Sequence, residues 1–270
     1  MEKGNEQFLS GQYQVAIGTF NQILAKDSSN LRARQVLAES YRLSNRIEAS
    51  TPHYQALVAE QPTFESYFHL GQSLKANQQN EAAKQALEEA ALLTSDDRFL
   101  ARVKQEIASL RLGSSIGEYF PNYQLVNYQE LNSAGADYAP LASEDFLYFT
   151  SGRASSSLYA ATGTPYHQLF RTRADGLKVD AGGVQLLPEF QNEEGLNQAA
   201  LAISPDGNTL IYARGNSTST KDFPETTLFV SYFRGSGFTE PIWMPVNEDE
   251  TWWNSTPAFS ADGAELFFAS

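Results

Sequence analysis

The sequence predicts an α + β multidomain chain in which an N-terminal α-solenoid is followed by an incomplete all-β propeller. Residues 1–112 have helical periodicity and repeat, whereas residues 123–270 are rich in Tyr, Phe, Thr, Gly and Pro and carry a recurring turn motif. Between them, residues 113–122 (GSSIGEYFPN) contain two Gly, two Ser and one Pro, which predicts a linker. Helical repeats of this kind stack into a solenoid, and short strands between regular turns build radial sheets.

The helical domain contains three copies of a pattern about 34 residues long. Small residues recur at intervals of 34 and 33 residues, at Gly4, Ala38 and Gly71. A larger side chain at these positions would push the two helices of a pair apart. The third copy reads Tyr67-x-x-Leu70-Gly71-x-x-Leu74, which resembles the tetratricopeptide repeat, a helix–turn–helix unit.

Three serines depart from the repeat pattern without changing the predicted architecture. Ser28 and Ser95 stand where repeats one and three would close with Pro, and Ser50 replaces a small apolar residue of repeat two. Residues 98–111 are expected to form a cap helix whose N-cap comes from the segment 94–97. Such a cap is expected because an open helical stack must end on a polar face.

Tetratricopeptide arrays present a concave groove lined by the first helix of each pair. By register, the candidate partner-binding residues are Asn5, Phe8, Gln35, Glu39, Arg42, Phe68, Gln72 and Lys75. We expect a segment of a partner protein to bind there; the alternative is a solvated inner surface of mixed polarity. The set lacks the full Lys/Asn/Arg clamp that some arrays use, so it predicts no C-terminal carboxylate as the ligand.

The second domain contains two copies of one hairpin-turn motif, Ser204-Pro205-Asp206-Gly207 and Ser260-Ala261-Asp262-Gly263. Asp-Gly between two apolar runs predicts a hairpin, because Gly can adopt the positive φ that closes the turn. A third copy, Ser143-Glu144-Asp145, lacks the Gly, and the three turn serines are spaced 61 and 56 residues apart. We expect the repeated Asp to bond turn amides and not to act in catalysis.

A repeat of this length with about four strands is typical of a propeller blade. In the second blade we expect strands in the segments AALAIS, TLIYAR, TTLFVSYF and FTEPIWM. At roughly 57–60 residues a blade, the domain would hold about two and a half blades, whereas a ring needs at least four. We therefore expect the propeller to continue beyond the printed chain.

The repeated motif P-x-x-S-x-D-G-x-x-L-x-F resembles the repeat of TolB-type propellers. The opening version, from Leu131-Asn132-Ser133 through Asp137 to Gly152-Arg153, resembles a narrower group, the OmpA-family lipoproteins of Bacteroidetes. In these proteins tetratricopeptide repeats precede the propeller, and a peptidoglycan-binding domain follows it. The resemblance implies a periplasmic, outer-membrane-associated scaffold of type IX secretion or gliding, whose leader has been removed. Its partners would be envelope or secretion proteins, with peptidoglycan reached through a missing C-terminal domain.

Composition excludes several other classes of function. The chain has no Cys, which excludes disulfides and thiolate sites, and it has no apolar run of 18 residues that would span a membrane. Its net charge of −13 resides almost entirely in residues 114–270, which hold 7 Lys and Arg against 19 Asp and Glu. This acidity argues against binding to nucleic acid or to an anionic lipid surface.

No motif predicts an enzyme. Residues 113–117 fit G-x-S-x-G, but a nucleophile needs a strand–turn–helix elbow, and here a helix is expected before the motif and a strand after it. The three histidines, His53, His69 and His167, share no ligand spacing, and the first two are interpreted as packed helix residues. The acidic run 248–250 lacks the spacing of a calcium loop, and no phosphate-binding glycine motif is present. We predict no metal, no cofactor and no catalytic residue.

The adjacent Trp252 and Trp253 offer a second candidate surface for a partner or a glycan. Neighbouring residues on a strand point to opposite faces, so one ring can be buried in the blade while the other is available for recognition. The predicted function is a non-catalytic scaffold that binds one partner through the repeat groove and another through the propeller. Two alternatives remain open. One is the propeller of a prolyl-oligopeptidase-like peptidase whose catalytic domain is missing, and the other is a glycan- or peptide-binding surface module.

Overall fold

The structure is a computed structural model of the chain, and it divides the protein into two compact units. The helical unit comprises Met1–Leu125 and Ala160–Thr162, and the sheet unit comprises Val126–Tyr159 and Gly163–Ser270. The residues that the structure describes are 1–119, 127–143, 145–153, 155–187, 195–215, 226–235, 237–247 and 253–270.

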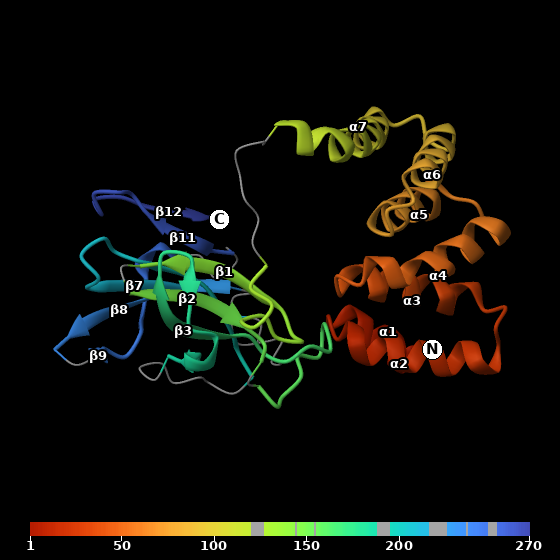
Figure 1. Cartoon of the computed structure of the whole chain (residues 1–270). Helices are drawn as coiled ribbons and strands as arrows, with labels where there is room; N and C mark the ends of the chain where they lie inside the picture. The colour runs from red at the N-terminus through yellow and green to blue at the C-terminus, as the bar shows by residue number, and fades with distance from the viewer. Residues whose placement is uncertain are drawn as a thin grey trace. The chain divides into compact units, whose positions relative to one another are not determined.

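The helical unit is an α-solenoid of tetratricopeptide type, built from three antiparallel helix pairs and a long final helix (Figure 1). The helices are α1 (Glu2–Leu9), α2 (Tyr13–Lys26), α3 (Leu31–Leu43), α4 (Ile47–Glu60), α5 (Phe64–Ala76), α6 (Asn80–Leu92) and α7 (Asp97–Tyr119). The predicted three-repeat register is therefore observed as α1–α2, α3–α4 and α5–α6.

The recurring small residues lie where paired helices touch. A Cβ atom added at Gly71 would lie 2.6 Å from Cγ of Leu87 on α6, and one added at Gly4 would lie 2.9 Å from Cζ of Phe20 on α2. Ala38, the small residue of the middle pair, is completely buried. The 34- and 33-residue spacing thus marks the close approach of the two helices in each pair.

The final helix is longer than the sequence predicts. It begins at Asp97, and the carboxylate of Asp96 accepts a hydrogen bond from the backbone N–H of Arg98 at 2.8 Å, as expected of an N-cap. It then runs through residues 113–119, where we predicted the first part of a linker, and that prediction is wrong for these residues. Gly and Ser lower helix propensity by about 1 kcal/mol or less but remove no backbone donor, unlike Pro, and the first Pro here is Pro121. The G-x-S-x-G sequence therefore lies on a helix, and residues 120–122 lie outside the described residues.

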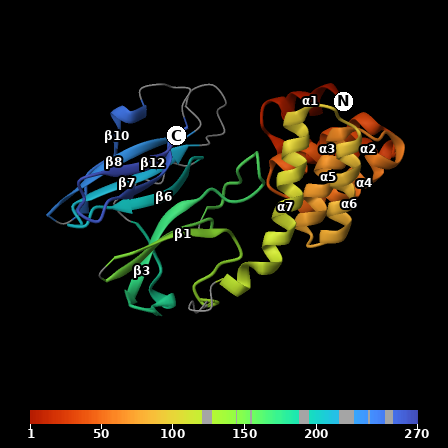
Figure 2. The same cartoon turned by 90° about the horizontal axis from the view of Figure 1, so that it is seen from above.

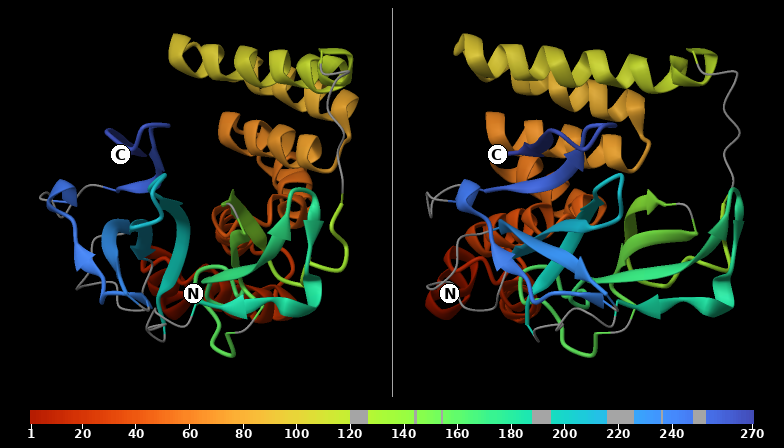
Figure 3. Two further views of the ribbon diagram at one scale, coloured as in Figure 1. Left: turned by 60° about the vertical axis from the view of Figure 1, so that its left-hand side comes forward. Right: turned by 90° about the vertical axis from the view of Figure 1, so that its left-hand side faces the viewer.

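In the described residues of the sheet unit there are three antiparallel sheets, which curl strongly (Figure 3). The first has the order β1 (Asp137–Ala142), β2 (Phe146–Ser151), β3 (Gln168–Asp175), β4 (Lys178–Val179), with β5 (Gln185–Leu186) also paired to β3. The second has the order β10 (Ile242–Trp243), β8 (Thr226–Arg234), β7 (Thr209–Gly215), β6 (Asn197–Ile203), with β9 (Gly237–Phe238) paired to β8. The third pairs β11 (Ser255–Phe259) with β12 (Leu266–Ala269). The four strands expected in the second blade are all present, the last as the two short pieces β9 and β10.

The two Asp-Gly turns share the same glycine conformation and the same bonds from the serine hydroxyl and the backbone amide to the Asp carboxylate. Gly207 and Gly263 both have φ +72°, and the serine hydroxyl that opens each turn donates to the Asp carboxylate, Ser204 to Asp206 at 2.5 Å and Ser260 to Asp262 at 2.6 Å. In each turn the same carboxylate oxygen accepts a backbone N–H two residues later at 3.1 Å. The serine hydroxyl first, and then this amide, hold the pKa of both carboxyls below their ordinary value. The prediction that this Asp shapes the turn is confirmed.

Figure 2 shows β7 between β8 and β6 in the second sheet, and alternate side chains of β7 belong to core clusters with different neighbouring sheets, as expected for stacked propeller blades. Leu210 and Tyr212 belong to a core cluster with Leu169 of the first sheet, whereas Ile211 packs in a cluster with Phe259 of the third. Because successive side chains of a strand point to opposite faces, the second sheet lies between the other two. The predicted architecture, a helical solenoid followed by an incomplete propeller, agrees with the structure.

Candidate partner-binding groove

The predicted groove residues lie on the first helix of each pair. Asn5 and Phe8 are on α1, and the other two helices contribute Gln35, Glu39 and Arg42 from α3 and Phe68, Gln72 and Lys75 from α5. Glu39 and Arg42 belong to one group of polar contacts and Gln72 and Lys75 to a second, and His69 lies between the two groups; together they are called the polar network. Asn5 and Phe8 take part in none of the hydrogen bonds or ion pairs that the structure describes for this network. Phe8 instead packs edge to face on Tyr13, with ring centroids 5.6 Å apart.

Phe68 is not a groove residue. It is 2% exposed and packs in a cluster with Phe64 and with Val103 of α7. The guanidinium carbon of Arg102 lies 4.9 Å above its ring. The prediction for Phe68 is wrong because α7 packs on α5 and covers this side chain, whereas we expected α7 only to provide a polar end to the helical stack.

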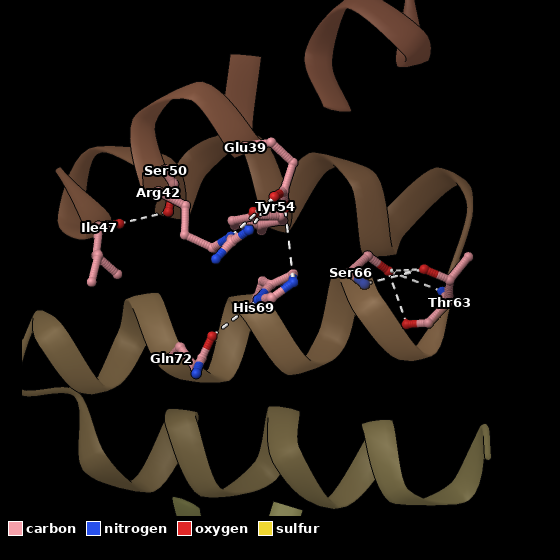
Figure 4. A network of polar contacts seen from close by, with 9 residues as sticks. All are labelled: Glu39, Arg42, Ile47, Ser50, Tyr54, Thr63, Ser66, His69 and Gln72. Atoms are coloured by element: carbon pink, nitrogen blue, oxygen red, sulfur yellow. Dashed lines mark hydrogen bonds and ion pairs between the residues drawn. The ribbon is translucent and has the colours of Figure 1, made fainter. Parts of the chain in front are cut away.

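Glu39 is the centre of the polar network (Figure 4). Its Oε2 accepts hydrogen bonds from Arg42 Nε at 3.0 Å and from Arg42 Nη2 at 2.5 Å, while its Oε1 accepts the hydroxyl of Tyr54 from α4. Burial alone would raise the pKa of Glu39, but the bonds from Arg42 and Tyr54 outweigh burial and hold that pKa below its ordinary value. Burial, followed by the charge of Glu39, raises the pKa of Tyr54. Glu39 is thus ionised and Tyr54 neutral at neutral pH.

His69 connects this centre to α7. Its Nδ1 lies 3.0 Å from Gln72 Oε1, and the Gln72 amide nitrogen donates to Glu106 Oε1 at 2.9 Å. Lys75 donates to the second oxygen, Glu106 Oε2, at 2.8 Å. Burial lowers the pKa of His69, so its imidazole is neutral at neutral pH. Directional bonds thus join α3 to α4 at Glu39 and α5 to α7 at Glu106, and the two groups of bonds meet where His69 Nε2 lies 3.9 Å from Glu39 Oε1.

Sequence reasoning missed Tyr54, His69 and Glu106. Glu39, Gln72 and Glu106 are spaced 33 and 34 residues apart, so Glu106 occupies on α7 the position that Gln72 occupies on α5. Extending the repeat register into the cap helix would have found it. His69 was correctly interpreted as a packed helix residue, yet it also lines the groove; no periodic signal distinguishes these two roles.

A pocket of about 110 Å³ opens beside the network. Its walls include Glu39 and Gln35 from α3, Tyr54 from α4, and Glu65 and His69 from α5. Pockets for small-molecule ligands are usually about 300–1,000 Å³. This pocket therefore has room for one side chain of a partner and not for a cofactor.

The second predicted surface is described only in part. Trp253 is 47% exposed, and Trp243 on β10 is 44% exposed. Trp252 and the acidic run 248–250 lie outside the described residues. A separate pocket of about 410 Å³ lies between the first two sheets, with Phe146, Ile203 and Phe238 in its walls.

No three His, Asp or Glu side chains of the described residues gather closely enough to hold a metal ion. Of the helices that the structure describes, none has the length and apolar character needed to cross a membrane.

Comparison with known proteins finds similar folds among solved structures, whereas no protein-family model and no curated protein matches the chain. The first tetratricopeptide domain of human RPAP3 is 23% identical over 45% of this chain and 93% of that one, with a TM-score of 0.36. The Yersinia enterocolitica type III secretion chaperone SycD, solved with a peptide of the translocator YopD, is 18% identical over 42% and 90%, with a TM-score of 0.37. The Sgt2 tetratricopeptide domain from Aspergillus fumigatus is 17% identical over 49% and 88%, with a TM-score of 0.36. At these identities the likeness concerns the fold alone.

Proposed function

We propose that the chain is a non-catalytic scaffold whose helical groove binds an extended segment of a partner protein. The observation that carries this proposal is the ordered polar network of Glu39, His69 and Glu106 beside a pocket of side-chain size. A network in which each member already has a partner fixes its side chains before any ligand arrives, and this lowers the entropy cost of binding. Gln35, at the edge of the pocket, is exposed and free of that network.

The sheet unit is proposed to bind a second partner. Its acidic balance favours a basic protein surface. The exposed Trp253 and the pocket between the first two sheets are the surfaces that support this part of the proposal. Bound at two places, the chain would hold two proteins of one machine together.

We further propose that the protein acts in the bacterial envelope. The order of a tetratricopeptide array before a TolB-type propeller supports a periplasmic, outer-membrane-associated protein of the type IX secretion or gliding machinery. Its partners would then be other envelope proteins.

The test is a pull-down from an envelope extract with the full chain and three variants. We expect Gln35→Ala and Arg42→Ala to reduce recovery of one partner, and Trp253→Ala to reduce recovery of another. Gln35→Ala separates binding from folding, because Gln35 is exposed, whereas Arg42→Ala also removes a bond to Glu39. If all three variants recover the same proteins as the unaltered chain, the scaffold proposal is wrong.

A second candidate function is glycan or peptide binding by the sheet unit alone, favoured by the exposure of Trp253. Aromatic side chains with one open face are common recognition elements. In that case Trp253→Ala would abolish all recovery, and the two groove variants would have no effect.

A further inference from the structure

Two hydrogen-bond acceptors face each other at the wall of the groove pocket. His69 Nε2 lies 3.9 Å from Glu39 Oε1, which is too long for a hydrogen bond between them (Figure 4). Both residues line the pocket. The protonation of this one nitrogen therefore decides what the pocket can bind.

The surrounding bonds assign that proton. A carboxylate only accepts, so Glu106 orients the Gln72 amide with its nitrogen toward Glu106 and its oxygen toward His69. The Gln72 oxygen can only accept, so His69 must carry its proton on Nδ1. In the neutral imidazole, Nε2 is then a bare acceptor directed toward Glu39.

The pocket thus presents an acceptor pair with no donor between its members. The Glu39 carboxylate also accepts from Tyr54 at Oε1 and from Arg42 at Oε2, so a donor on a ligand would be a further partner of Oε1. Two acceptors at this separation are stabilised when a donor group lies between them.

The charge of the lining selects the kind of donor. The pocket is lined by two carboxylates, Glu39 and Glu65, and the described residues that line it include no Lys or Arg. An ammonium group offers three donors and a positive charge, and its alkyl stem suits a pocket of about 110 Å³. We propose that this pocket binds the lysine side chain of the partner segment, with its ammonium group between Glu39 Oε1 and His69 Nε2. This inference rests on the proposed function, because it names the chemistry of the segment that the groove binds.

Binding of the ammonium depends on pH. The charged groups that face His69 are Glu39 and Arg42 from α3 and Arg102 from α7, with Glu65 on its own helix at the pocket wall. Protonation of His69 converts Nε2 into a donor to Glu39 and adds a positive charge at the site. The lysine ammonium is then excluded, so affinity falls as the pH drops below the pKa of His69.

The test uses n-butylammonium chloride as the probe, titrated into the full chain labelled with ¹⁵N. The chain has three histidines, so His69→Asn identifies the His69 imidazole signals by their loss. We expect saturable shifts of the His69 Nε2 signal at pH 7.5, and binding that weakens progressively as the pH is lowered through the pKa of His69, which the same imidazole signals measure. Glu65→Gln should weaken binding about two- to fivefold, the range of a partly exposed ion pair. Glu48→Gln, the same charge change at an exposed position outside the pocket lining, should leave it unchanged.

Three results would overturn the inference: butyrate shifts the His69 signal as strongly as butylammonium, n-butanol binds equally well, or Glu48→Gln weakens binding as much as Glu65→Gln. His69→Asn keeps a donor for Gln72 and removes the Nε2 acceptor, so Glu65 amide shifts in that variant must lose their response to the probe. The probe tests the pocket alone, and the pull-down tests the scaffold. A failed titration with a successful pull-down therefore rejects only the lysine assignment, and the reverse rejects only the scaffold.

Discussion

Replacing Asp137 with Asn should destabilise the sheet unit by about 2 to 3 kcal/mol. Arg153 Nη2 donates to Asp137 Oδ1 at 2.7 Å, and the backbone N–H of Ser133 donates to Asp137 Oδ2 at 2.6 Å. Burial would raise the pKa of Asp137, but hydrogen bonds from Ser151, Arg153 and Ser133 outweigh burial and lower the pKa to about 2. Relative to the ordinary value of 3.8, this shift corresponds to about 2 kcal/mol of stability. The remainder comes from leaving Arg153, which is 19% exposed, without its charged partner.

Asp137 also predicts a pH dependence. Its pKa is depressed in the folded state, so its contribution is fully present above about pH 4 and is lost as the pH falls toward 2. The Asn variant cannot titrate at this position. The difference in stability between the two proteins should therefore narrow over that interval, most of it being lost by about pH 2.

The assay is urea unfolding with two probes. All three tryptophans, Trp243, Trp252 and Trp253, belong to the sheet unit, so tryptophan fluorescence reports that unit, while circular dichroism at 222 nm is dominated by the helical unit. With a slope of about 2 to 3 kcal/mol per M, the fluorescence midpoint of Asp137→Asn should fall by about 1 M, with the helical transition unchanged. Asp175→Asn makes the same chemical change on β3, where the structure describes no ion pair, and should have little effect. Equal fluorescence midpoints for Asp137→Asn and the unaltered protein would show that the ionised Asp137 does not stabilise the sheet unit.

Three further changes test the packing, the turn and the groove. Gly71→Ala should destabilise the helical unit by about 1 to 3 kcal/mol, because the new Cβ would lie 2.6 Å from a side-chain carbon of the paired helix. Gly18→Ala, where nothing lies within 4 Å of the new Cβ, should instead stabilise the unit by about 0.5 to 1 kcal/mol. Urea unfolding followed at 222 nm distinguishes the loss of stability from the gain. Gly207→Ala should cost the sheet unit about 1 kcal/mol, seen in the fluorescence midpoint, because φ is +72° there; an unchanged midpoint would contradict the turn geometry. Tyr54→Phe removes a hydrogen bond to Glu39 and should raise the pKa of that carboxyl, measured by ¹³C carboxyl shifts against pH; a pKa that stays the same would show that the bond is not formed in solution.

Sequence alone could predict the architecture because both repeats are local patterns. The Gly4, Ala38 and Gly71 spacing reflects a steric requirement within each helix pair, and the Ser-x-Asp-Gly turn is stabilised by its own side chains. Requirements of this kind can be read from a few neighbouring residues. The end of α7 could not be predicted in the same way, since Gly and Ser weaken a helix without stopping it.

The groove was predicted less well than the fold because its composition depends on contacts between helices far apart in sequence. The register placed Glu39, Arg42, Gln72 and Lys75 on one surface; Glu39 bonds to Arg42, and Gln72 and Lys75 both bond to Glu106. It could not show that α7 buries Phe68, which requires the packing of α7 on α5. The position of the proton on His69 could not be predicted either, because it follows from bonds that link Glu106 of α7 to Gln72 and His69 of α5.

Site-specific photo-cross-linking is the most direct test of whether the groove formed by the first helices binds a segment of a partner protein. A photoreactive amino acid at Gln35, beside the pocket, is compared with one at Glu89, an exposed position on α6, in the same envelope extract. We expect a discrete cross-linked protein from position 35, which excess unaltered chain competes away, and none from position 89. Equal cross-linking from both positions, or none from position 35, would contradict this expectation.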